Sequence, residues 1–446
     1  MTIDARAVGP LDRSRRRGRP GRWAPAAPWV PAALCALWVA GCGDNLSSPK
    51  VGPPIEPSEQ LFVNAHYDDD MIFMQPELLH GVEAGSTTTL YVYSGDPIHG
   101  QGRQWHSFRA AKVAYSSATG STDWDCGYLV VRGSPVHHCR LRDRSISLIA
   151  LDLPDGGIEG TYDVSPLHLA QDDVTSVPIL GARGGIATKE TIVAELAALI
   201  TAIDPVQIHA LDLAGTHGRE HVSHLFSSSF AFWGAARAGY QGAIRWHRAY
   251  SVDGEAITLD DADYQAVKPM LGYFWACYAG CAPCGTSCAT LDPTHDVRLR
   301  RRYSATRSLV DTSGTLSLDD DPALCLSVAA GVVVIADCAG ATQVQLDPSG
   351  HLRIPGDGGA AERCLASPPG AADPVVLEAC DDTPEQYWAA DSEHHVWNGR
   401  PPDAAPEMYY DHVRCLNAAP QPGAVLAAPI CGSRLHPTWH FGSEAL

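Results

Sequence analysis

The sequence predicts an α/β domain with a mostly parallel sheet, followed by an all-β domain. Between Leu61 and about Tyr303, short apolar runs of strand character alternate with longer segments of helical periodicity. This alternation is typical of a parallel sheet covered by helices on both faces. From about Ser313 the helical periodicity stops, and short strands alternate with turns rich in Gly, Pro and Asp. The 446 residues leave room for two separate cores.

The first 41 residues are expected to be an export signal rather than part of a fold. An arginine-rich leader precedes an apolar stretch that ends in small residues before Cys42, which is the order of a lipoprotein-type cleavage site. A transmembrane anchor is the alternative, but Pro25, Pro28 and Pro31 leave a short apolar run for spanning a bilayer. We therefore expect Cys42 to carry a lipid that anchors the protein in the cell envelope, on its periplasmic or extracellular face.

The rest of the composition fits an acidic, exported protein. Residues 42–59 are rich in proline and have no period, which predicts a tether. The formal net charge is −19, and removal of the arginine-rich leader would make the chain more acidic. Such a surface argues against a nucleic-acid partner, because phosphate contacts need clustered cations. Twelve cysteines follow Cys42, and an even number in an exported chain predicts disulfides.

The first stretch with unusual chemistry ends the first predicted strand. Leu61-Phe62-Val63-Asn64-Ala65 is followed by His66-Tyr67-Asp68-Asp69-Asp70. Adjacent carboxylates at the end of a buried strand repel one another unless a cation or solvent compensates them. His66 and Asp69 would face the crevice above the strand ends, where α/β sheets bind ligands, and imidazole with carboxylate suits zinc. The alternative is that the aspartates only cap a helix beginning near Met71.

Further elements follow in regular order. The sequence predicts helices over Met71–Val82, Trp105–Ala118 and Lys189–Ile203, and strands over Thr89–Ser94, Gly127–Arg132 and Val206–Leu211. Cys126 and Cys139 flank the third strand and the loop after it. We expect these two cysteines to form a disulfide.

A second polar cluster runs from Asp212 to His224, directly after the strand at Val206–Leu211. His221 and His224 would share one helix face if a helix begins near Glu220. One of them would complete a metal site and the other would stabilise charge. The alternative is a merely polar helix start, but two such clusters at two strand ends favour a site.

Together the two clusters resemble the LmbE-like (PIG-L) zinc-dependent de-N-acetylases. The first motif of that family reads Ala-His-Pro-Asp-Asp-Glu or -Asp, and the second reads His-Pro-Asp-His. The resemblance runs from about Leu61 to Tyr303, and Leu153-Pro154-Asp155-Gly156 falls where family members carry the same tetrapeptide. It implies a Rossmann-like catalytic domain over residues 60–308.

Carried over by position, the resemblance implies Zn²⁺ on His66, Asp69 and His224. It implies that Asp68 is the general base and His221 an electrostatic helper, and it suggests Asp96 as a contact to the substrate sugar. Two positions differ from the family pattern. Tyr67 replaces the proline after the histidine, and Val222-Ser223 replaces Pro-Asp between the two histidines. The carboxylate that would orient His221 is therefore missing, and Glu220 or Asp212 are candidates to replace it.

The implied reaction is hydrolysis of the N-acetyl group of an N-acetylglucosamine-type glycan or glycoconjugate, giving a free amine and acetate. Zinc activates the water and Asp68 takes its proton. One alternative is a zinc amidase acting on a different amide-bearing glycoconjugate. The other is a surface carbohydrate-binding protein whose catalytic body has decayed.

Four cysteines lie within twelve residues, at Cys277, Cys281, Cys284 and Cys288. They suit either a structural zinc site or two disulfides, and an oxidising compartment favours the disulfides. Three pairings are possible, and the sequence does not choose among them.

The C-terminal segment contains three related units. Each begins with Cys-Leu, contains a second cysteine and then a Gln-x-Trp-like triplet; the cysteine pairs are Cys325 and Cys338, Cys364 and Cys380, and Cys415 and Cys431. Three such units indicate a closed repeat and resemble the ricin B-type β-trefoil over residues 313–446. The aspartate that usually grips sugar in that family is replaced by Ser327, Ala366 and Asn417. Binding of a glycan ligand is thus expected from the fold analogy alone.

Overall fold

The structure is a computed structural model, and its description covers separate ranges of the chain. These are residues 50–95, 100–157, 168–169, 174–180, 184–211, 221–308, 312–346, 351–356, 361–368, 373–381, 384–386, 388–390, 396–398, 414–429 and 437–441. Cys42 and the predicted export signal lie outside them. Within these ranges, no helix combines the length and the apolar character needed to cross a membrane.

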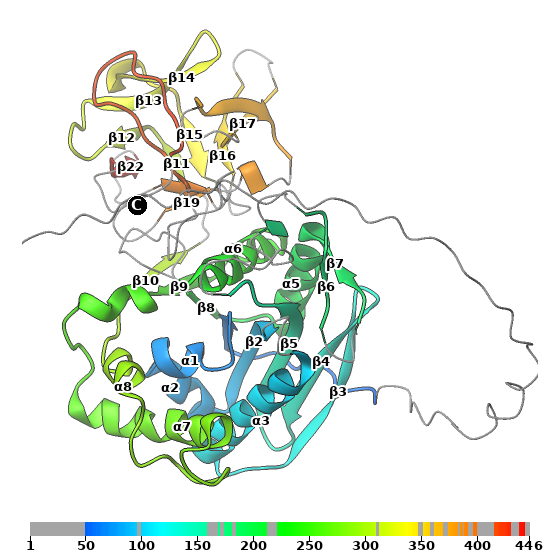
Figure 1. Cartoon of the computed structure of the whole chain (residues 1–446). Helices are drawn as coiled ribbons and strands as arrows, with labels where there is room; N and C mark the ends of the chain where they lie inside the picture. Colours follow the sequence, from blue (N-terminus) through cyan, green and yellow to red (C-terminus); the bar gives the residue numbers. More distant parts are fainter. Residues whose placement is uncertain are drawn as a thin grey trace, which may run out of the picture. The chain divides into compact units, whose positions relative to one another are not determined.

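The first part of the chain is a mixed α/β structure around an eight-stranded sheet (Figure 1). In spatial order its strands are β10 (Ser304–Ser308), β9 (Ala243–His247), β8 (Gln207–Leu211), β1 (Gln60–Asn64), β2 (Ser86–Gly95), β5 (Ser145–Pro154), β4 (Ser134–Leu141) and β3 (Trp124–Val131). The strands from β9 to β5 are parallel, and both edges are antiparallel. The predicted mostly parallel sheet is confirmed.

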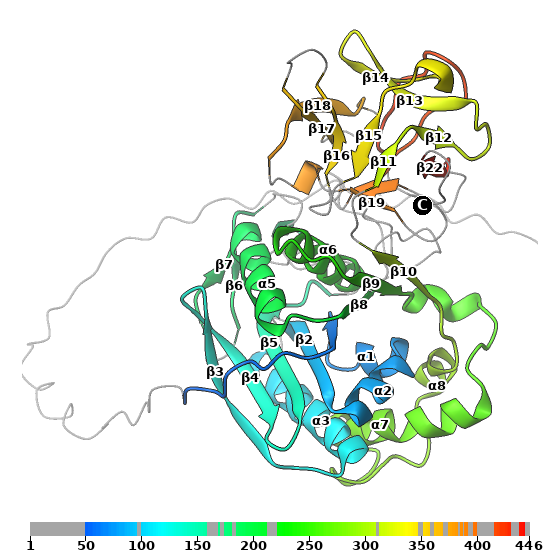
Figure 2. The same cartoon turned by 180° about the vertical axis from the view of Figure 1, so that it is seen from behind.

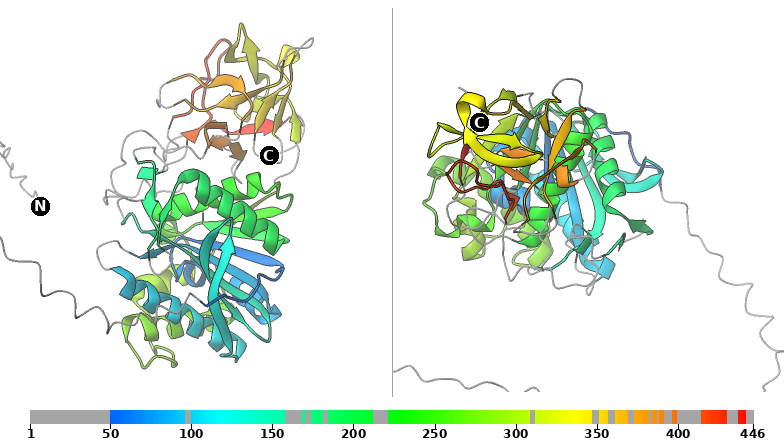
Figure 3. Two further views of the ribbon diagram at one scale, coloured as in Figure 1. Left: turned by 90° about the vertical axis from the view of Figure 1, so that its right-hand side faces the viewer. Right: turned by 90° about the horizontal axis from the view of Figure 1, so that it is seen from above.

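Helices cover both faces of this sheet (Figure 3). The helices of this part are α1 (Asp69–Phe73), α2 (Glu77–Ala84), α3 (Gly100–Thr119), α5 (Lys189–Ile203), α6 (Val222–Arg237), α7 (Asp261–Ala279) and α8 (Pro293–Leu299). Helices α5 and α6 pack together on one face, and α3 packs on α7 on the other. Leu61, Phe62 and Val63 of β1 are completely buried between them, as expected for a strand covered on both sides.

The predicted helix over Trp105–Ala118 and strand over Thr89–Ser94 lie within the longer α3 and β2, and two predicted elements differ from the structure in more than their bounds. The helix expected over Met71–Val82 is interrupted, with α1 ending at Phe73 and α2 beginning at Glu77. The break is at Pro76, which has no N–H to donate and disfavours a helical residue before it. The strand expected over Gly127–Arg132 is the first of three antiparallel strands, β3, β4 and β5. The strict alternation of strand and helix therefore fails there.

Residues 50–59, from the predicted tether, run from the β3 edge of the sheet past β4 towards β2 (Figure 2). The Gly52 N–H donates to Tyr128 O (2.9 Å), and the Tyr128 N–H donates to Lys50 O (2.9 Å). Glu56 forms an ion pair with Arg140 of β4. This part of the predicted tether is thus packed on the sheet, and the backbone bonds of Lys50 and Gly52 cover the exposed edge of β3.

The described cysteines are paired in disulfides. Cys126 and Cys139 lie directly opposite each other on β3 and β4 and are bonded, as predicted. The four clustered cysteines form two disulfides rather than a zinc site, and the pairs are Cys277–Cys284 and Cys281–Cys288. Cys325–Cys338 and Cys364–Cys380 bridge two of the C-terminal units, while Cys431 lies outside the described residues. This number of disulfides fits an exported protein.

The C-terminal part consists of small antiparallel sheets with a core of their own. Their orders are β11-β15-β16-β17-β18, β14-β13-β12-β22 and β19-β20-β21, built from β11 (Thr312–Gly314), β12 (Leu316–Leu318), β13 (Leu324–Ala329), β14 (Val332–Asp337), β15 (Val344–Leu346), β16 (Leu352–Ile354), β17 (Arg363–Ala366), β18 (Val376–Ala379), β19 (Trp388–Ala390), β20 (Val396–Asn398), β21 (Arg414–Cys415) and β22 (Trp439–Phe441).

Two of the predicted units bury their tryptophan in the same way. The Trp388 Nε1–H donates to Leu365 O (2.9 Å), and the Trp439 Nε1–H donates to Leu416 O (3.1 Å). In each case the acceptor is the leucine of the Cys-Leu pair, 23 residues earlier. The first unit has Gln345 at the tryptophan position and buries Val344 instead. The equivalent hydrogen bonds support an internal repeat.

A buried histidine pair lies in the parallel part of the sheet, on β8 and β9. His209 Nδ1 lies 3.0 Å from His247 Nε2, and the His209 ring stacks on Phe62. Burial, and then the charges of Arg245 and Arg302, lowers the pKa of His209 to about 3. Burial, and then the charge of His209, lowers the pKa of His247 well below its ordinary value. Both rings are therefore neutral in the folded protein.

This pair predicts that the metal-free protein loses stability as the pH falls below about 6.5, the ordinary pKa of histidine. Below this pH, His209 and His247 bind protons in the unfolded chain but not in the folded protein, so acid favours unfolding. Each ring should cost about 1.4 kcal/mol per pH unit in that range. Urea unfolding of chelator-treated protein at pH 7, 6 and 5 measures this. Replacing His247 with Gln should reduce the slope of the unfolding free energy against pH. Equal slopes in wild type and the His247 variant would contradict the account.

Candidate metal centre

The two polar motifs meet at one edge of the parallel sheet. His66 follows β1, and α1 begins three residues later at Asp69. His221 is the N-cap of α6, the next helix after β8. Because β1 and β8 are parallel neighbours, their carboxyl ends lie side by side. The topology thus brings together residues that are about 150 positions apart in the sequence.

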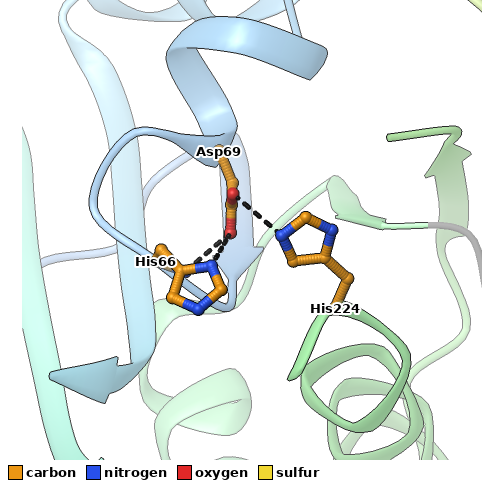
Figure 4. Close-up of side chains that lie close together, drawn as sticks. All are labelled: His66, Asp69 and His224. Carbon is orange, nitrogen blue, oxygen red and sulfur yellow. Dashed lines mark hydrogen bonds and ion pairs between the residues drawn. The ribbon is translucent and has the colours of Figure 1, made fainter. Parts of the chain in front are cut away.

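His66, Asp69 and His224 form a compact group of metal-ligand atoms (Figure 4). Asp69 lies between the two rings: His224 Nε2 is 3.2 Å from Asp69 Oδ1, and His66 Nδ1 is 3.4 Å from Asp69 Oδ2. The three ligand atoms all lie within 4.8 Å of one another. His224 is completely buried and Asp69 is 2 % exposed. Two imidazoles and one carboxylate at this spacing could bind a metal ion.

The charge state of Asp69 suits a ligand. Burial alone would raise its pKa, but the charges of His224 and His66 and their hydrogen bonds outweigh burial and hold the pKa of Asp69 well below its usual range. The backbone N–H of His66 also donates to Asp69 Oδ2 (2.6 Å). Asp69 is therefore a fixed anion, which is the form that coordinates a cation.

The three consecutive aspartates have different surroundings. Asp68 occupies the N-cap position of α1, but its side chain makes no capping hydrogen bond. Burial, and then the charge of Asp69, raises the pKa of Asp68 to about 6. Asp70 accepts hydrogen bonds from Tyr115 Oη (2.5 Å) and Tyr91 Oη (3.3 Å). These hydroxyls stabilise the carboxylate, but burial outweighs them and raises the pKa of Asp70 to about 7. Capping does not account for the side chain of Asp68.

Asp155 is a fourth carboxylate in this cluster, and the sequence-based residue set did not include it as a site residue. It directly follows β5, whose carboxyl end lies at the same edge of the sheet. Asp155 Oδ2 lies 3.5 Å from His66 Nε2, while Asp155 Oδ1 accepts hydrogen bonds from Ser223 Oγ (2.5 Å) and the Gly157 N–H (3.1 Å). The signal that could have found it is the Leu153-Pro154-Asp155-Gly156 segment at the end of a strand.

The carboxylate missing between the two motif histidines thus has a counterpart in Asp155. Ser223 stands where the resembled family has aspartate, and its hydroxyl holds Asp155. Glu220 and Asp212, which the sequence suggested as replacements for the carboxylate that orients His221, lie outside the described residues. Asp155 also forms a second group of possible metal ligands with His66 and His221. The two groups share His66, whose Nδ1 faces Asp69 and whose Nε2 faces Asp155.

His221 is a neutral ring in this structure. Its Nδ1 accepts a hydrogen bond from the Ser223 backbone N–H (3.1 Å), so the ring proton is on Nε2. Burial, and then the charges of His66 and His224, lowers the pKa of His221 well below its ordinary value. If His221 acts as the electrostatic helper that the resemblance implies, it therefore does so as a neutral ring that donates from Nε2–H.

One predicted site residue is not described by the structure, and one buried aromatic residue near the site was not predicted. Asp96, expected to contact substrate, lies outside the described residues. Tyr93, near the end of β2, is 1 % exposed, and its ring lies 6.3 Å from that of His66. Its hydroxyl has no hydrogen-bond partner in the described part of the chain. No pattern in the sequence distinguishes Tyr93 from the other aromatic residues of the core.

Comparison with known proteins assigns no family to this arrangement. No protein-family model matches the chain, and no curated protein matches its sequence.

Proposed function

We propose that the protein is a zinc-dependent hydrolase that removes the N-acetyl group from N-acetylglucosamine-type glycans or glycoconjugates. The observation that carries this proposal is the group of His66, Asp69 and His224, with Asp68 beside it, at the carboxyl edge of a parallel sheet. The same residues carry the resemblance to the LmbE-like de-N-acetylases.

The donor set supports zinc. Two histidines and one carboxylate are a common ligand set of catalytic zinc, which needs a fourth position for water or substrate. His66 would bind through Nδ1, the nitrogen that faces Asp69, while its Nε2–H donates to Asp155. A carboxylate behind a ligand histidine fixes its tautomer and ring orientation. The His66 side chain is 24 % exposed and that of Asp155 is 17 % exposed, so solvent reaches the group from this side.

Asp68, His221 and Asp155 then have separate roles in the proposed reaction. Bound zinc supplies Lewis-acid activation of water and of the amide carbonyl. Asp68 accepts the proton of the attacking water, and a pKa of about 6 suits a base that works near neutral pH. His221 donates its Nε2–H to the oxygen that becomes negative as the carbonyl is attacked. Asp155 keeps His66 in place through the hydrogen bonds from Ser223 and Gly157.

The remaining parts of the chain support a function at the cell surface. We propose that residues 313–446 form a β-trefoil of the ricin B type that binds carbohydrate and targets the hydrolase to glycans. This proposal is supported by the equivalent tryptophan hydrogen bonds in two of the repeated units and by the disulfides within two units. Lipidation of Cys42 would tether the enzyme to a membrane, in agreement with the disulfides expected of an exported protein.

The test is release of acetate from N-acetylglucosamine oligomers by the purified, zinc-loaded protein. We expect release that stops with a chelator and returns on addition of zinc. Oligomers carrying a free amine instead of the acetamide serve as the control substrate. Zinc-loaded protein that releases no acetate from any oligomer would contradict the deacetylase assignment, and release that a chelator does not affect would contradict a metal-dependent mechanism.

A further inference from the structure

A pocket in the α/β part is lined by none of the residues of the metal centre. It has a volume of about 480 Å³ and runs along one face of α3. Arg109, Lys112 and Ser116 lie on this face at helical spacing. Trp124 of β3 and Tyr273 of α7 also line the pocket, and Figure 2 shows α3 and α7 side by side. The volume falls in the range of small-molecule sites.

The pocket is positive, although the chain has 51 acidic and 32 basic residues. No lining residue is acidic. Neither Arg109 nor Lys112 forms an ion pair with a carboxylate in the described part of the chain. Other arginines of the same part do have such partners: Arg142, Arg237 and Arg245 pair with Asp123, Glu190 and Glu77. Two cations one helical turn apart repel each other unless an anion lies near them.

Lys112 is the more buried of the two cations. It is partly buried, and among the described residues its Nζ donates only to Cys126 Sγ at 3.7 Å. A sulfur atom is a weak acceptor for an ammonium group with three donors. Burial, and then the charge of Arg109, lowers the pKa of Lys112. A bound anion would relieve both effects by accepting hydrogen bonds and compensating the charge.

The opposite wall offers an aromatic surface with a hydroxyl beside it. The Trp124 Nε1–H donates to Ser116 Oγ (2.9 Å), which fixes the indole ring and leaves the serine hydroxyl proton to donate elsewhere. Trp124 and Tyr273 are partly exposed. Aromatic walls with a few convergent polar groups are typical of sites for small organic ligands.

We propose that this pocket binds a ring compound that carries one anionic group, with the anion on Arg109 and Lys112 and the ring against Trp124 and Tyr273. The anionic group is a carboxylate, sulfate or phosphate, and the volume suits a molecule of monosaccharide to disaccharide size. The site is separate from the metal centre, so the proposal does not depend on the hydrolase function.

The test is calorimetric titration of the purified full chain at low ionic strength. The probes are glucuronic acid, N-acetylglucosamine 6-sulfate and N-acetylglucosamine 6-phosphate, with N-acetylglucosamine as the neutral control. We expect at least one anionic probe to bind, more weakly as salt screens the charges, and the neutral sugar not to bind at this site. The comparison of the three probes identifies the anionic group. Binding should persist after chelator treatment, which separates this site from the metal centre.

Variants then locate the binding site. Replacing Lys112 with Met should weaken binding about 10–100-fold, the effect of removing one hydrogen bond to a charged group, and replacing Lys112 with Arg should restore most of it. Replacing Arg142 with Gln is the matched control, because it removes an equal charge outside the pocket. Absence of binding by all three anionic probes, or equal weakening in the Arg142 variant, would overturn the proposal.

Discussion

Replacing Asp68 with asparagine is expected to leave zinc bound and to lower turnover by about 10²–10⁴-fold, the usual contribution of a general base. Asp68 lies outside the group of ligand atoms formed by His66, Asp69 and His224. Its side chain also makes no capping hydrogen bond, so the helix should tolerate the change. The amide keeps the size of the carboxylate but does not accept the proton of water. Zinc content and the rate of acetate release, measured on the same preparation, give the two results.

Neighbouring aspartates provide matched controls. Replacing Asp69 with asparagine removes an anionic ligand and should lower zinc content and activity together. Replacing Asp70 with asparagine changes a carboxylate that accepts hydrogen bonds from Tyr115 and Tyr91 and should leave zinc content near that of wild type. If the Asp68 variant loses zinc while the Asp69 variant keeps both zinc and activity, the two roles are reversed. Wild-type turnover in the Asp68 variant would show that Asp68 has no role in catalysis.

Asp155 is the second residue whose replacement should have a large effect, here on zinc affinity. Replacing it with asparagine should weaken zinc binding about 10–100-fold, the usual cost of losing a carboxylate behind a ligand histidine. The reason is that Asp155 Oδ2 faces His66 Nε2 while Oδ1 is held by Ser223 and Gly157. The measurement is a competition titration with a chelator of known affinity, together with the melting temperature of the metal-free variant.

Replacing Asp143 with asparagine is the control for this change, because Asp143 is an exposed acid that accepts a hydrogen bond from Ser121. It should leave zinc affinity unchanged. If the Asp155 variant binds zinc like wild type, the carboxylate does not orient His66. A large fall in the melting temperature of the metal-free variant would assign Asp155 to the stability of the fold instead.

Local signals predicted much of the α/β part. The helix over Lys189–Ile203 has the predicted bounds, because Thr188 and Thr191 form a capping box that sets its start and the apolar periodicity sets its length. The end of β1 was predictable because an apolar run stops at a polar cluster. That the two motifs meet followed from placing both at carboxyl ends of strands in one parallel sheet. The choice of His224 rather than His221 as the ligand beside His66 and Asp69 came from the family resemblance.

Non-local pairing limited the remaining predictions. The hairpin of β3 and β4 was missed because an antiparallel strand pair and a strand followed by a loop share the same short apolar runs. The pairing of the four clustered cysteines depends on how the loop folds after α7. Asp155 was noted in the tetrapeptide but was not predicted to be a site residue, because its partners His66 and Ser223 are 89 and 68 residues away. Only the sheet order brings β5 next to β2.

Zinc content tests the central claim most directly. The purified protein, dialysed against trace zinc, should contain about one zinc per chain, and replacing His224 with alanine should remove it, because three protein ligands are typical of a catalytic site. Replacing His221 with alanine should leave the zinc in place. Full zinc occupancy in the His224 variant, together with loss of zinc in the His221 and Asp155 variants, would contradict the account and move the metal to the group of His66, Asp155 and His221.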